Sequence, residues 1–175
     1  RTFLRLGFLY SQVLYHNRSP DLLNSRAAMA SLLEILAITA RGDVRSDVIK
    51  EIERHANILD AFRSKPGVDP GRLKLVMSDL LRLRTELLAL NANFMLPLRE
   101  SEFLNGIKHR SAIPGGTCEF DLPDYNYWLN RPAETRLAMF NRWLDLLRPI
   151  CEGVTQSLWV TRQSAHPRSE VAVGG

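Results

Sequence analysis

The stretch "DPGRLKLVMSDLLRLRTELLAL", residues 69–90, decides the fold class. Aspartate followed by proline at its start is typical of a helix N-cap and a first helical position. Apolar residues then recur at the three- and four-residue steps of an α-helix and form one long stripe: Leu73, Val76, Met77, Leu80, Leu83, Leu87 and Leu90. Leu81 and Leu88 lie on a second face. A helix with two apolar faces needs two packing partners, so this stretch predicts a helical bundle.

The rest of the chain is patterned in the same way. Helical periodicity and caps predict further helices over residues 2–16, 19–40, 43–62, 123–129 and 132–148, a shorter one that ends near 108–110, and a last one over 150–163. Ser19 is expected to be an N-cap followed by Pro20, and Pro149 is expected to separate the last two helices. Period-two alternation does not exceed residues 118–122, so no sheet is predicted. The expected fold class is all-α, a multi-helix bundle with short loops.

The length and composition of the chain indicate a single domain. A chain of 175 residues with 45% hydrophobic residues has the material for a sizeable core. Cys118 and Cys151 are far apart and follow no metal-ligand spacing, which argues against a disulfide scaffold and a zinc site and fits a reducing cytoplasm. No apolar run reaches the ~20 residues that cross a bilayer, so a membrane is not an expected partner.

The net charge of +4 is carried by 19 arginines and 4 lysines. Arginine pairs bidentately with carboxylates and phosphates, so the surplus suits an acidic peptide or a nucleic acid as partner. A GC-rich genome would produce the same surplus without any function. Acidic residues interrupt every positive run, as in residues 43–55, and no recognition helix is present. A basic nucleic-acid-binding helical protein is therefore the alternative function, and nucleic acid is not the expected partner.

The sequence contains no recognisable catalytic, metal or cofactor motif. "PGGTC", residues 114–118, has the glycines of a phosphate loop, but no lysine follows them and no helix opens directly after them. His109 lies near Cys118 in sequence, yet a buried cysteine is expected there rather than a nucleophile. The other histidines are isolated and are expected to be surface or capping residues: His16, His55 and His166. An enzyme is not expected.

One segment does not fit the helical pattern: "SAIPGGTCEFDLPDYNYWL", residues 111–129. Pro114 disfavours helical angles in the residue before it, and the two glycines after it permit positive φ. The chain is therefore expected to turn sharply and to run extended over residues 117–121. Such a loop either only reverses the chain or also faces a partner. Two aromatic residues of the segment are expected to enter the core: Phe120 and Trp128.

The same segment resembles the signature of the ZapD family of bacterial cell-division proteins. The matching residues are Ile113, Pro114, Gly115, Gly116, Cys118, Phe120, Asp121, Leu122, Pro123 and Trp128. Other stretches look like family positions in the same order: residues 1–5, 41–45, 66–69 and 162–165. The likeness extends over nearly the whole chain.

The resemblance implies a cytoplasmic cell-division factor that acts at the division site. Members of the family bind the C-terminal peptide of the tubulin-like protein FtsZ and, as homodimers, cross-link FtsZ filaments into bundles. The resemblance also implies that residues 1–165 are a helical domain for dimerisation and FtsZ binding. Residues 166–175 would be a tail or linker toward a β-rich domain that is absent from this chain.

A basic surface is implicated in FtsZ binding in this family. Arg5 and Arg41 fall on family positions that carry arginine, and Arg45 lies beside them, so these three are the candidate FtsZ-binding residues. The alternatives are a buried ion pair for Arg5 and a helix C-cap for Arg41. The chain departs from the family pattern at Glu102, where some members have arginine, and at Asn126, where some have histidine.

The seam of a dimer is expected on residues 69–90 or 2–16, because each helix has more apolar surface than one bundle face covers. Twofold symmetry duplicates a binding patch, which is what cross-linking requires.

Overall fold

The structure is a computed structural model that describes residues 1–19 and 21–164. This part of the chain forms eight helices and no strand: α1 (Thr2–His16), α2 (Leu22–Thr39), α3 (Val44–Asp60), α4 (Pro70–Ala89), α5 (Leu96–Arg99), α6 (Glu102–Ser111), α7 (Pro123–Leu129) and α8 (Ala133–Ser164). The predicted all-α class is confirmed. The predicted tail, residues 166–175, lies outside the described residues.

Aspartates begin three of the long helices. The side chains of Asp21, Asp43 and Asp69 accept hydrogen bonds from backbone N–H groups in the first turns of α2, α3 and α4. Each bond satisfies a donor that the helix itself leaves unpaired. The predicted cap at residue 69 is confirmed. The prediction that Ser19 caps the second helix is wrong, because Asp21 supplies the cap and the helix begins at Leu22.

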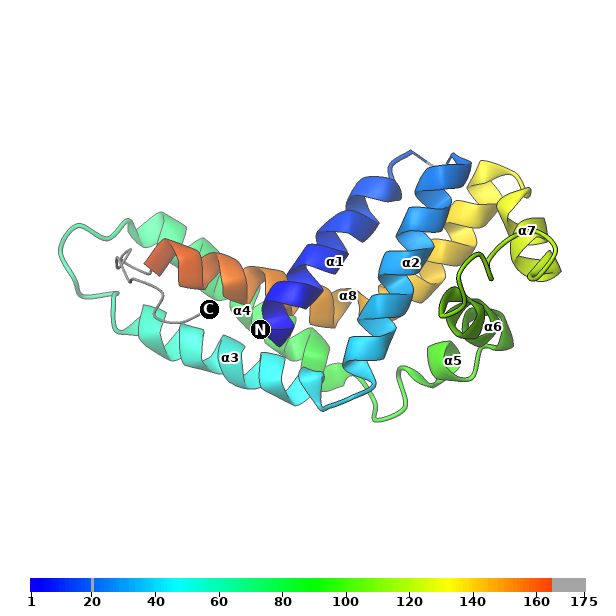
Figure 1. The fold of residues 1–175 in the computed structure, drawn as a ribbon. Coiled ribbons are helices and arrows are strands. Elements are labelled where there is room, and N and C mark those ends of the chain that lie inside the picture. The colour runs from blue at the N-terminus through cyan, green and yellow to red at the C-terminus, as the bar shows by residue number, and fades with distance from the viewer. Residues whose placement is uncertain (20, 165–175) are drawn as a thin grey trace, which may run out of the picture.

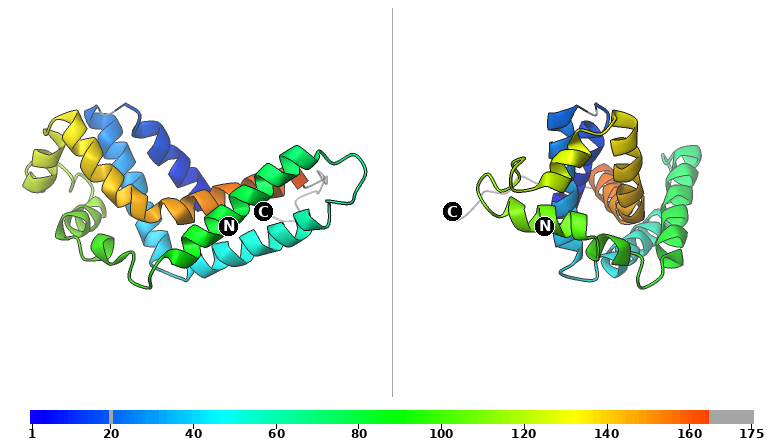
Figure 2. Two further views of the ribbon diagram at one scale, coloured as in Figure 1. Left: turned by 180° about the vertical axis from the view of Figure 1, so that it is seen from behind. Right: turned by 90° about the vertical axis from the view of Figure 1, so that its right-hand side faces the viewer.

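The longest helix, α8, runs through the whole molecule (Figure 1). Its first half, residues 133–148, lies beside α1 and α2, which pack on each other, and the three form what we call the first arm, flanked by α5, α6 and α7 (Figure 1). Its second half, residues 150–164, packs with α3 and α4 to form the second arm. The two arms meet at an angle (Figure 2), and we call their junction the elbow.

Pro149 lies inside α8, and this helix changes direction at the elbow (Figure 2). The prediction that Pro149 separates two helices is therefore wrong. Proline removes one backbone hydrogen bond and crowds the carbonyl four residues earlier, which bends a helix. The helix continues here because packing holds both sides of the proline: Leu147 and Ile150 are both buried in the core.

A glycine allows the second half of α8 to approach α3 and α4 closely. A Cβ atom placed on Gly153 would lie 2.6 Å from Cγ1 of Val48 and 3.4 Å from Cδ1 of Leu87. Any larger residue at position 153 would therefore push the helices of the second arm apart.

His55 of α3 is also buried in the second arm. Its Nε2 lies 3.2 Å from a carboxylate oxygen of Glu51 and 3.2 Å from the hydroxyl of Thr161. Burial lowers the pKa of His55, the Arg54 charge lowers it further, and Glu51 opposes both. The expectation that His55 is a surface or capping residue is wrong.

Aromatic rings fill the first arm where α8 meets α6 and α7. Phe103 stacks on Trp143 with 5.6 Å between ring centroids, and Tyr125 stacks on Trp128 at 6.0 Å. Trp128 is buried, as predicted. These rings contribute a large apolar area to the core and fix the short helices against α8.

Among the described helices, α2 alone is long and apolar enough to cross a membrane by length and composition. However, 44% of it is buried inside the fold, where it packs against α1 and α7. A helix that is apolar on several sides is expected to pack against several neighbours, and α2 has two of them in α1 and α7.

Candidate functional site

The elbow carries a groove with a volume of about 360 Å³. Its walls are the end of α2, the start of α3, the segment from the α4–α5 connection to the end of α5, and α8 just after Pro149. The lining residues are Thr39, Gly42, Asp43, Val44, Arg45, Ala92, Phe94, Met95, Arg99 and Ile150. We call this the elbow groove.

Arg45 shapes one wall of the elbow groove. Its Nε donates to the carbonyl oxygen of Leu87 at 2.8 Å, and its Nη2 donates to that of Leu88 at 3.3 Å. Both carbonyls belong to the last turn of α4, where a helix leaves acceptors unpaired and a cation is favoured. The half-buried Arg45 therefore joins α3 to the end of α4 and also brings positive charge to the groove.

A second arginine lines the groove, and a third precedes a lining residue in the sequence. Arg41, next to the lining residue Gly42, and Arg99, at the end of α5, are both exposed. Within the described residues, no hydrogen bond or ion pair engages either guanidinium. The C-cap residue of α2 is Ala40, so Arg41 lies one residue beyond the C-cap.

Asp43 is the acidic residue among those that line the groove. Its carboxylate accepts hydrogen bonds from the side chain and the backbone N–H of Ser46, and these bonds lower the pKa of the Asp43 carboxyl. The carboxylate is thus used in capping α3. Because Arg45 and Arg99 line the groove with this one carboxylate, the lining has a net positive charge.

The floor of the elbow groove is apolar. Val44, Met95 and Ile150 are buried, and Phe94 is half-buried against the core. An apolar floor with a positive rim suits a short protein segment that carries apolar side chains and carboxylates. The described residues contain no group of three or more His, Cys, Asp or Glu that could hold a metal ion.

Arg5 lies on the first turns of α1 and is not part of the groove lining. A Cβ atom placed on Gly7 would lie 2.9 Å from Cδ1 of Leu158, so α1 begins beside α8 beyond the bend. Arg5 is exposed, so the alternative of a buried ion pair is wrong. Of the three candidate arginines, Arg45 lines the groove and Arg41 precedes the lining residue Gly42, while the structure adds Arg99 to the lining.

The signature loop, residues 113–123, is fixed against the first arm. Gly115 has a φ of 74°, as the predicted sharp turn requires. Gly116 is buried against the backbone carbonyl of Arg110 and has no room for a side chain. From α2, Nη1 of Arg26 donates to the carbonyl oxygen of Thr117 at 3.0 Å. These contacts hold the loop in one form.

The loop differs from the prediction in three respects. Residues 117–121 form turns instead of an extended run, because the N–H of Leu122 donates to the carbonyl oxygen of Cys118 at 3.2 Å. Phe120 is 93% exposed and does not enter the core, since Leu122 packs against the core in its place. Cys118 is exposed rather than buried. The other signature residues are distributed as follows: Ile113 and Pro114 are exposed, Asp121 is half-buried, and Pro123 begins α7.

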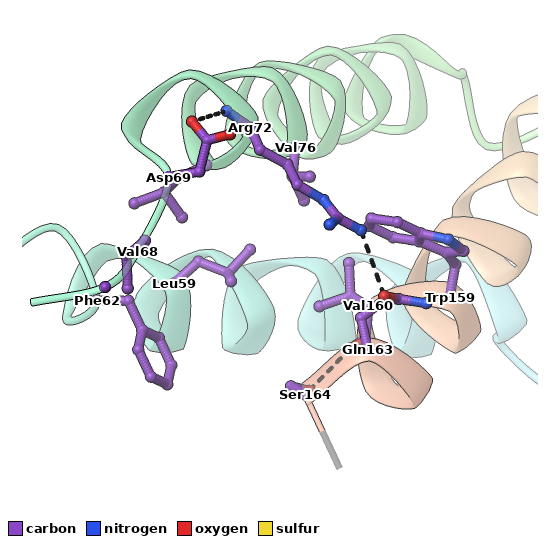
Figure 3. Close-up of a pocket in the computed structure, with 12 residues that line it drawn as sticks. Leu59, Phe62, Val68, Asp69, Arg72, Val76, Trp159, Val160, Gln163 and Ser164 are labelled. Carbon is purple, nitrogen blue, oxygen red and sulfur yellow. Dashed lines mark hydrogen bonds between the residues drawn. The ribbon is translucent and has the colours of Figure 1, made fainter. Parts of the chain in front are cut away.

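A second cavity, of about 390 Å³, lies at the free end of the second arm (Figure 3). Apolar side chains from α3, α4 and α8 line most of it, among them Leu59, Val76 and Trp159. Arg72 donates to Oε1 of Gln163 at 3.3 Å and lies 5.9 Å from the ring centroid of Trp159. None of the candidate FtsZ-binding residues lines this cavity, so the elbow groove is the stronger candidate site.

The sequence analysis missed Arg99 and Phe94. Both lie in "NANFMLPLRE", residues 91–100, which the periodicity marks only as a break between helices. A local signal was present: Leu96 followed by Pro97 is typical of a helix start. The short helix α5 that begins there carries Arg99 at its end.

Comparison of the sequence with known proteins shows the family to which the chain belongs. The family model described as ZapD, a cell division protein, matches residues 4–175. The chain is 37% identical over its whole length to the cell division protein ZapD of Aromatoleum aromaticum, of which it covers 68%. It is 36% identical to the ZapD of Dechloromonas aromatica and 35% identical to that of an Azoarcus species, and covers 69% and 70% of them. The chain belongs to the ZapD family of cell division proteins.

Proposed function

We propose that this protein binds the C-terminal peptide of FtsZ in the elbow groove and, as a homodimer, cross-links FtsZ filaments into bundles that support assembly of the division ring. The observation that carries the proposal is the groove with an apolar floor that Arg45 and Arg99 line, next to Arg41 in the sequence, in a member of a cell-division family. Arg5, on the first turns of α1, is proposed as a further contact beside the elbow.

The groove and the arginines have different tasks in this proposal. An exposed ion pair contributes only ~0–1 kcal/mol, so the arginines set the association rate and the salt sensitivity. The apolar floor holds the peptide. A micromolar site corresponds to about −8 kcal/mol, and sites arrayed along a filament raise the effective affinity by roughly 10²- to 10⁴-fold. Weak single sites are therefore sufficient for bundling.

Two linked grooves are needed to join two filaments, and a twofold dimer supplies them. We assign dimerisation and FtsZ binding to residues 1–165, with residues 166–175 leading toward the β-rich domain of the family. Glu102 and Asn126 depart from the family pattern on α6 and α7, outside the groove lining. They would thus leave the elbow groove unchanged.

The proposed place of action is the cytoplasm at the division site, and the proposed role is structural. Peptide capture in a groove needs no catalytic group and no cofactor. The partners in this proposal are FtsZ and a second copy of the chain, with no membrane.

Co-sedimentation and light scattering of polymerised FtsZ test the proposal. The unaltered chain should pellet with FtsZ filaments and raise their scattering, and both effects should fade with salt because the rim is charged. The double variant Arg41→Glu and Arg99→Glu should lose both effects and keep a helical circular dichroism spectrum. A matched control is Arg18→Glu with Arg142→Glu, because both arginines are exposed and neither lines the groove.

Bundling that survives in the groove variant, or disappears in the matched control, would place the FtsZ site elsewhere. The alternative, nucleic-acid binding, is tested by a gel shift with random duplex DNA. A steep salt slope on DNA together with no effect on FtsZ would favour that alternative.

A further inference from the structure

The cavity at the free end of the second arm, which we call the end cavity, is lined mostly by apolar side chains (Figure 3). Six of them are only half-buried: Leu59, Phe62, Val68, Leu73, Val76 and Trp159. They come from α3, α4, α8 and the connection between α3 and α4. Apolar side chains that gather around one exposed hollow mark a surface that another segment covers.

The helix α8 ends at the end cavity. Gln163 and Ser164, the last two residues that the structure describes, both line it. Eleven residues follow them in the chain, 165–175, and the ZapD family model matches the sequence through this segment. Pro167 disfavours helical angles in the residue before it, so the sequence does not predict a longer α8. The segment therefore starts at the edge of the end cavity.

The segment 165–175 carries one short apolar run, which consists of Val171, Ala172 and Val173. The residues before it, 165–170, reach at most about 20 Å when extended. This length is enough for a chain that starts at the edge of the cavity to turn back over it. Side chains two residues apart point to the same side of an extended chain. Val171 and Val173 can therefore enter the cavity together, while Ala172 faces away from it.

Charge at the rim of the end cavity complements the segment. Arg72 donates one hydrogen bond across the cavity to α8, and a guanidinium has five N–H donors in all. The Nζ of Lys65 lies 4.3 Å from the ring centroid of Phe62. The carboxylate of Asp69 accepts bonds from backbone N–H groups and caps α4. The rim thus offers positive charge to Glu170, which is the one carboxylate in residues 165–175 and directly precedes the apolar run.

The size of the end cavity favours a tethered occupant over a separate protein. A volume of about 390 Å³ accepts only a few side chains. Separate proteins that associate stably bury much more surface, ~1,600 Å² in a standard interface. A segment that is joined to the cavity edge through Ser164 needs fewer contacts, because its effective concentration at the cavity is in the millimolar range.

We propose that residues 171–173 of this chain dock in the end cavity, with Glu170 beside Arg72 and Lys65 at the rim. Among the described residues, the end cavity and the elbow groove share no lining residue. Docking therefore leaves the elbow groove open, and the inference does not depend on the proposed function. It identifies the end of the second arm as the place from which the chain continues toward the β-rich domain of the family.

Disulfide cross-linking tests the docking. In a Cys118→Ser background, which removes the exposed native thiol, Val76→Cys combined with Val171→Cys or with Val173→Cys should form a disulfide within one chain. The matched control combines Val76→Cys with Ala172→Cys, which faces away and should cross-link at least about 10-fold more slowly. Equal rates at the three positions, or no disulfide at any of them, would overturn the proposal. A disulfide that joins two chains would show that a second copy covers the cavity, and would overturn it too.

A charge exchange tests the position of Glu170 with the same cross-linking rate as readout. Arg72→Glu should slow the reaction by up to about 5-fold, the range of an exposed ion pair, and Glu170→Arg in the same chain should restore it. Lys74→Glu is the matched control, because Lys74 is exposed on α4 and does not line the end cavity. An exchange that fails to restore the rate, or an equal effect of Lys74→Glu, would overturn the placement of Glu170 at the rim.

The docked segment and the FtsZ site fail separately in these tests. Val171→Asp with Val173→Asp should release the segment and should bind the FtsZ C-terminal peptide as tightly as the unaltered chain. Loss of peptide binding in this variant would mean that the segment acts at the elbow groove, and would overturn docking in the end cavity. An unaltered chain that forms the predicted disulfides in its cysteine variants and fails to bind the peptide would overturn the proposed function alone.

Discussion

The first arm packs with aromatic rings, whereas the second arm packs around a glycine, although α8 provides a face to both. In the first arm, Trp128 and Trp143 lie with ring centroids 6.2 Å apart and fill the space between short helices. In the second arm, Gly153 lets α3 and α4 approach α8 closely. A single helix thus serves two kinds of packing, and the elbow groove lies where the two meet.

The largest expected effect is in the first arm, where the aromatic rings pack. Trp128→Ala leaves a cavity among Phe103, Tyr125 and Trp143 and should lower the free energy of unfolding by about 3–5 kcal/mol, as measured by urea denaturation. Trp128→Phe is the matched control. Within the described residues the indole N–H has no hydrogen-bond partner, so Phe keeps most of the packing and breaks no bond. Equal losses in both variants would contradict the packing account.

The second arm should lose stability when side-chain volume is added at Gly153. Gly153→Ala should lower the free energy of unfolding by about 1–3 kcal/mol, because the new methyl group meets Val48. Gly106→Ala in α6 is the matched control. Nothing lies within 4 Å of a Cβ there, and the better helix propensity of alanine should stabilise the protein by about 0.5–1 kcal/mol. Stabilisation by both substitutions would show that the second arm is not tightly packed at this position.

At the elbow, Arg45→Ala removes the bonds to the last carbonyls of α4. A loss of about 1–2 kcal/mol in the free energy of unfolding is expected. Arg41→Ala, a few residues away and without a recorded partner among the described residues, should change it by less than about 0.5 kcal/mol. Thermal or urea unfolding of the two variants thus distinguishes Arg45, which holds the end of α4, from Arg41, which does not. Equal effects would contradict the structural role of Arg45.

The smallest expected effect is the pH response of the second arm. Burial lowers the pKa of His55 in the folded state, so the unfolded chain binds the proton more tightly. The contribution of neutral His55 to the free energy of unfolding is complete above the ordinary histidine pKa of about 6.5. It is lost as the pH falls below that value toward the pKa of the folded state. His55→Gln should reduce this loss between neutral and mildly acidic pH in urea titrations. An unchanged pH profile would show that the carboxylates dominate there.

Local signals predicted much of the fold. The capping aspartate at residue 69 and the three- and four-residue apolar steps depend on neighbours in sequence, and the all-α class follows from them. Pro149 was misjudged because a proline ends or merely bends a helix according to the packing on both sides. Phe120 was misjudged because a turn hydrogen bond, invisible in the sequence, gives the core position to Leu122.

The candidate site was only partly predictable. The family resemblance supplied Arg41 and Arg45, whereas Arg99 and Phe94 come from a segment about fifty residues later in the chain. Four separate segments form the walls of the elbow groove, and only their arrangement around the bend in α8 brings them together.

The most direct test of the central claim is fluorescence anisotropy of a labelled FtsZ C-terminal peptide titrated with this chain. The account predicts saturable micromolar binding that weakens with salt, falls at least about 10-fold in the Arg41→Glu and Arg99→Glu double variant, and is unchanged in the Arg18→Glu and Arg142→Glu control. Binding of equal strength in the two double variants, or no saturable binding by the unaltered chain, would contradict it.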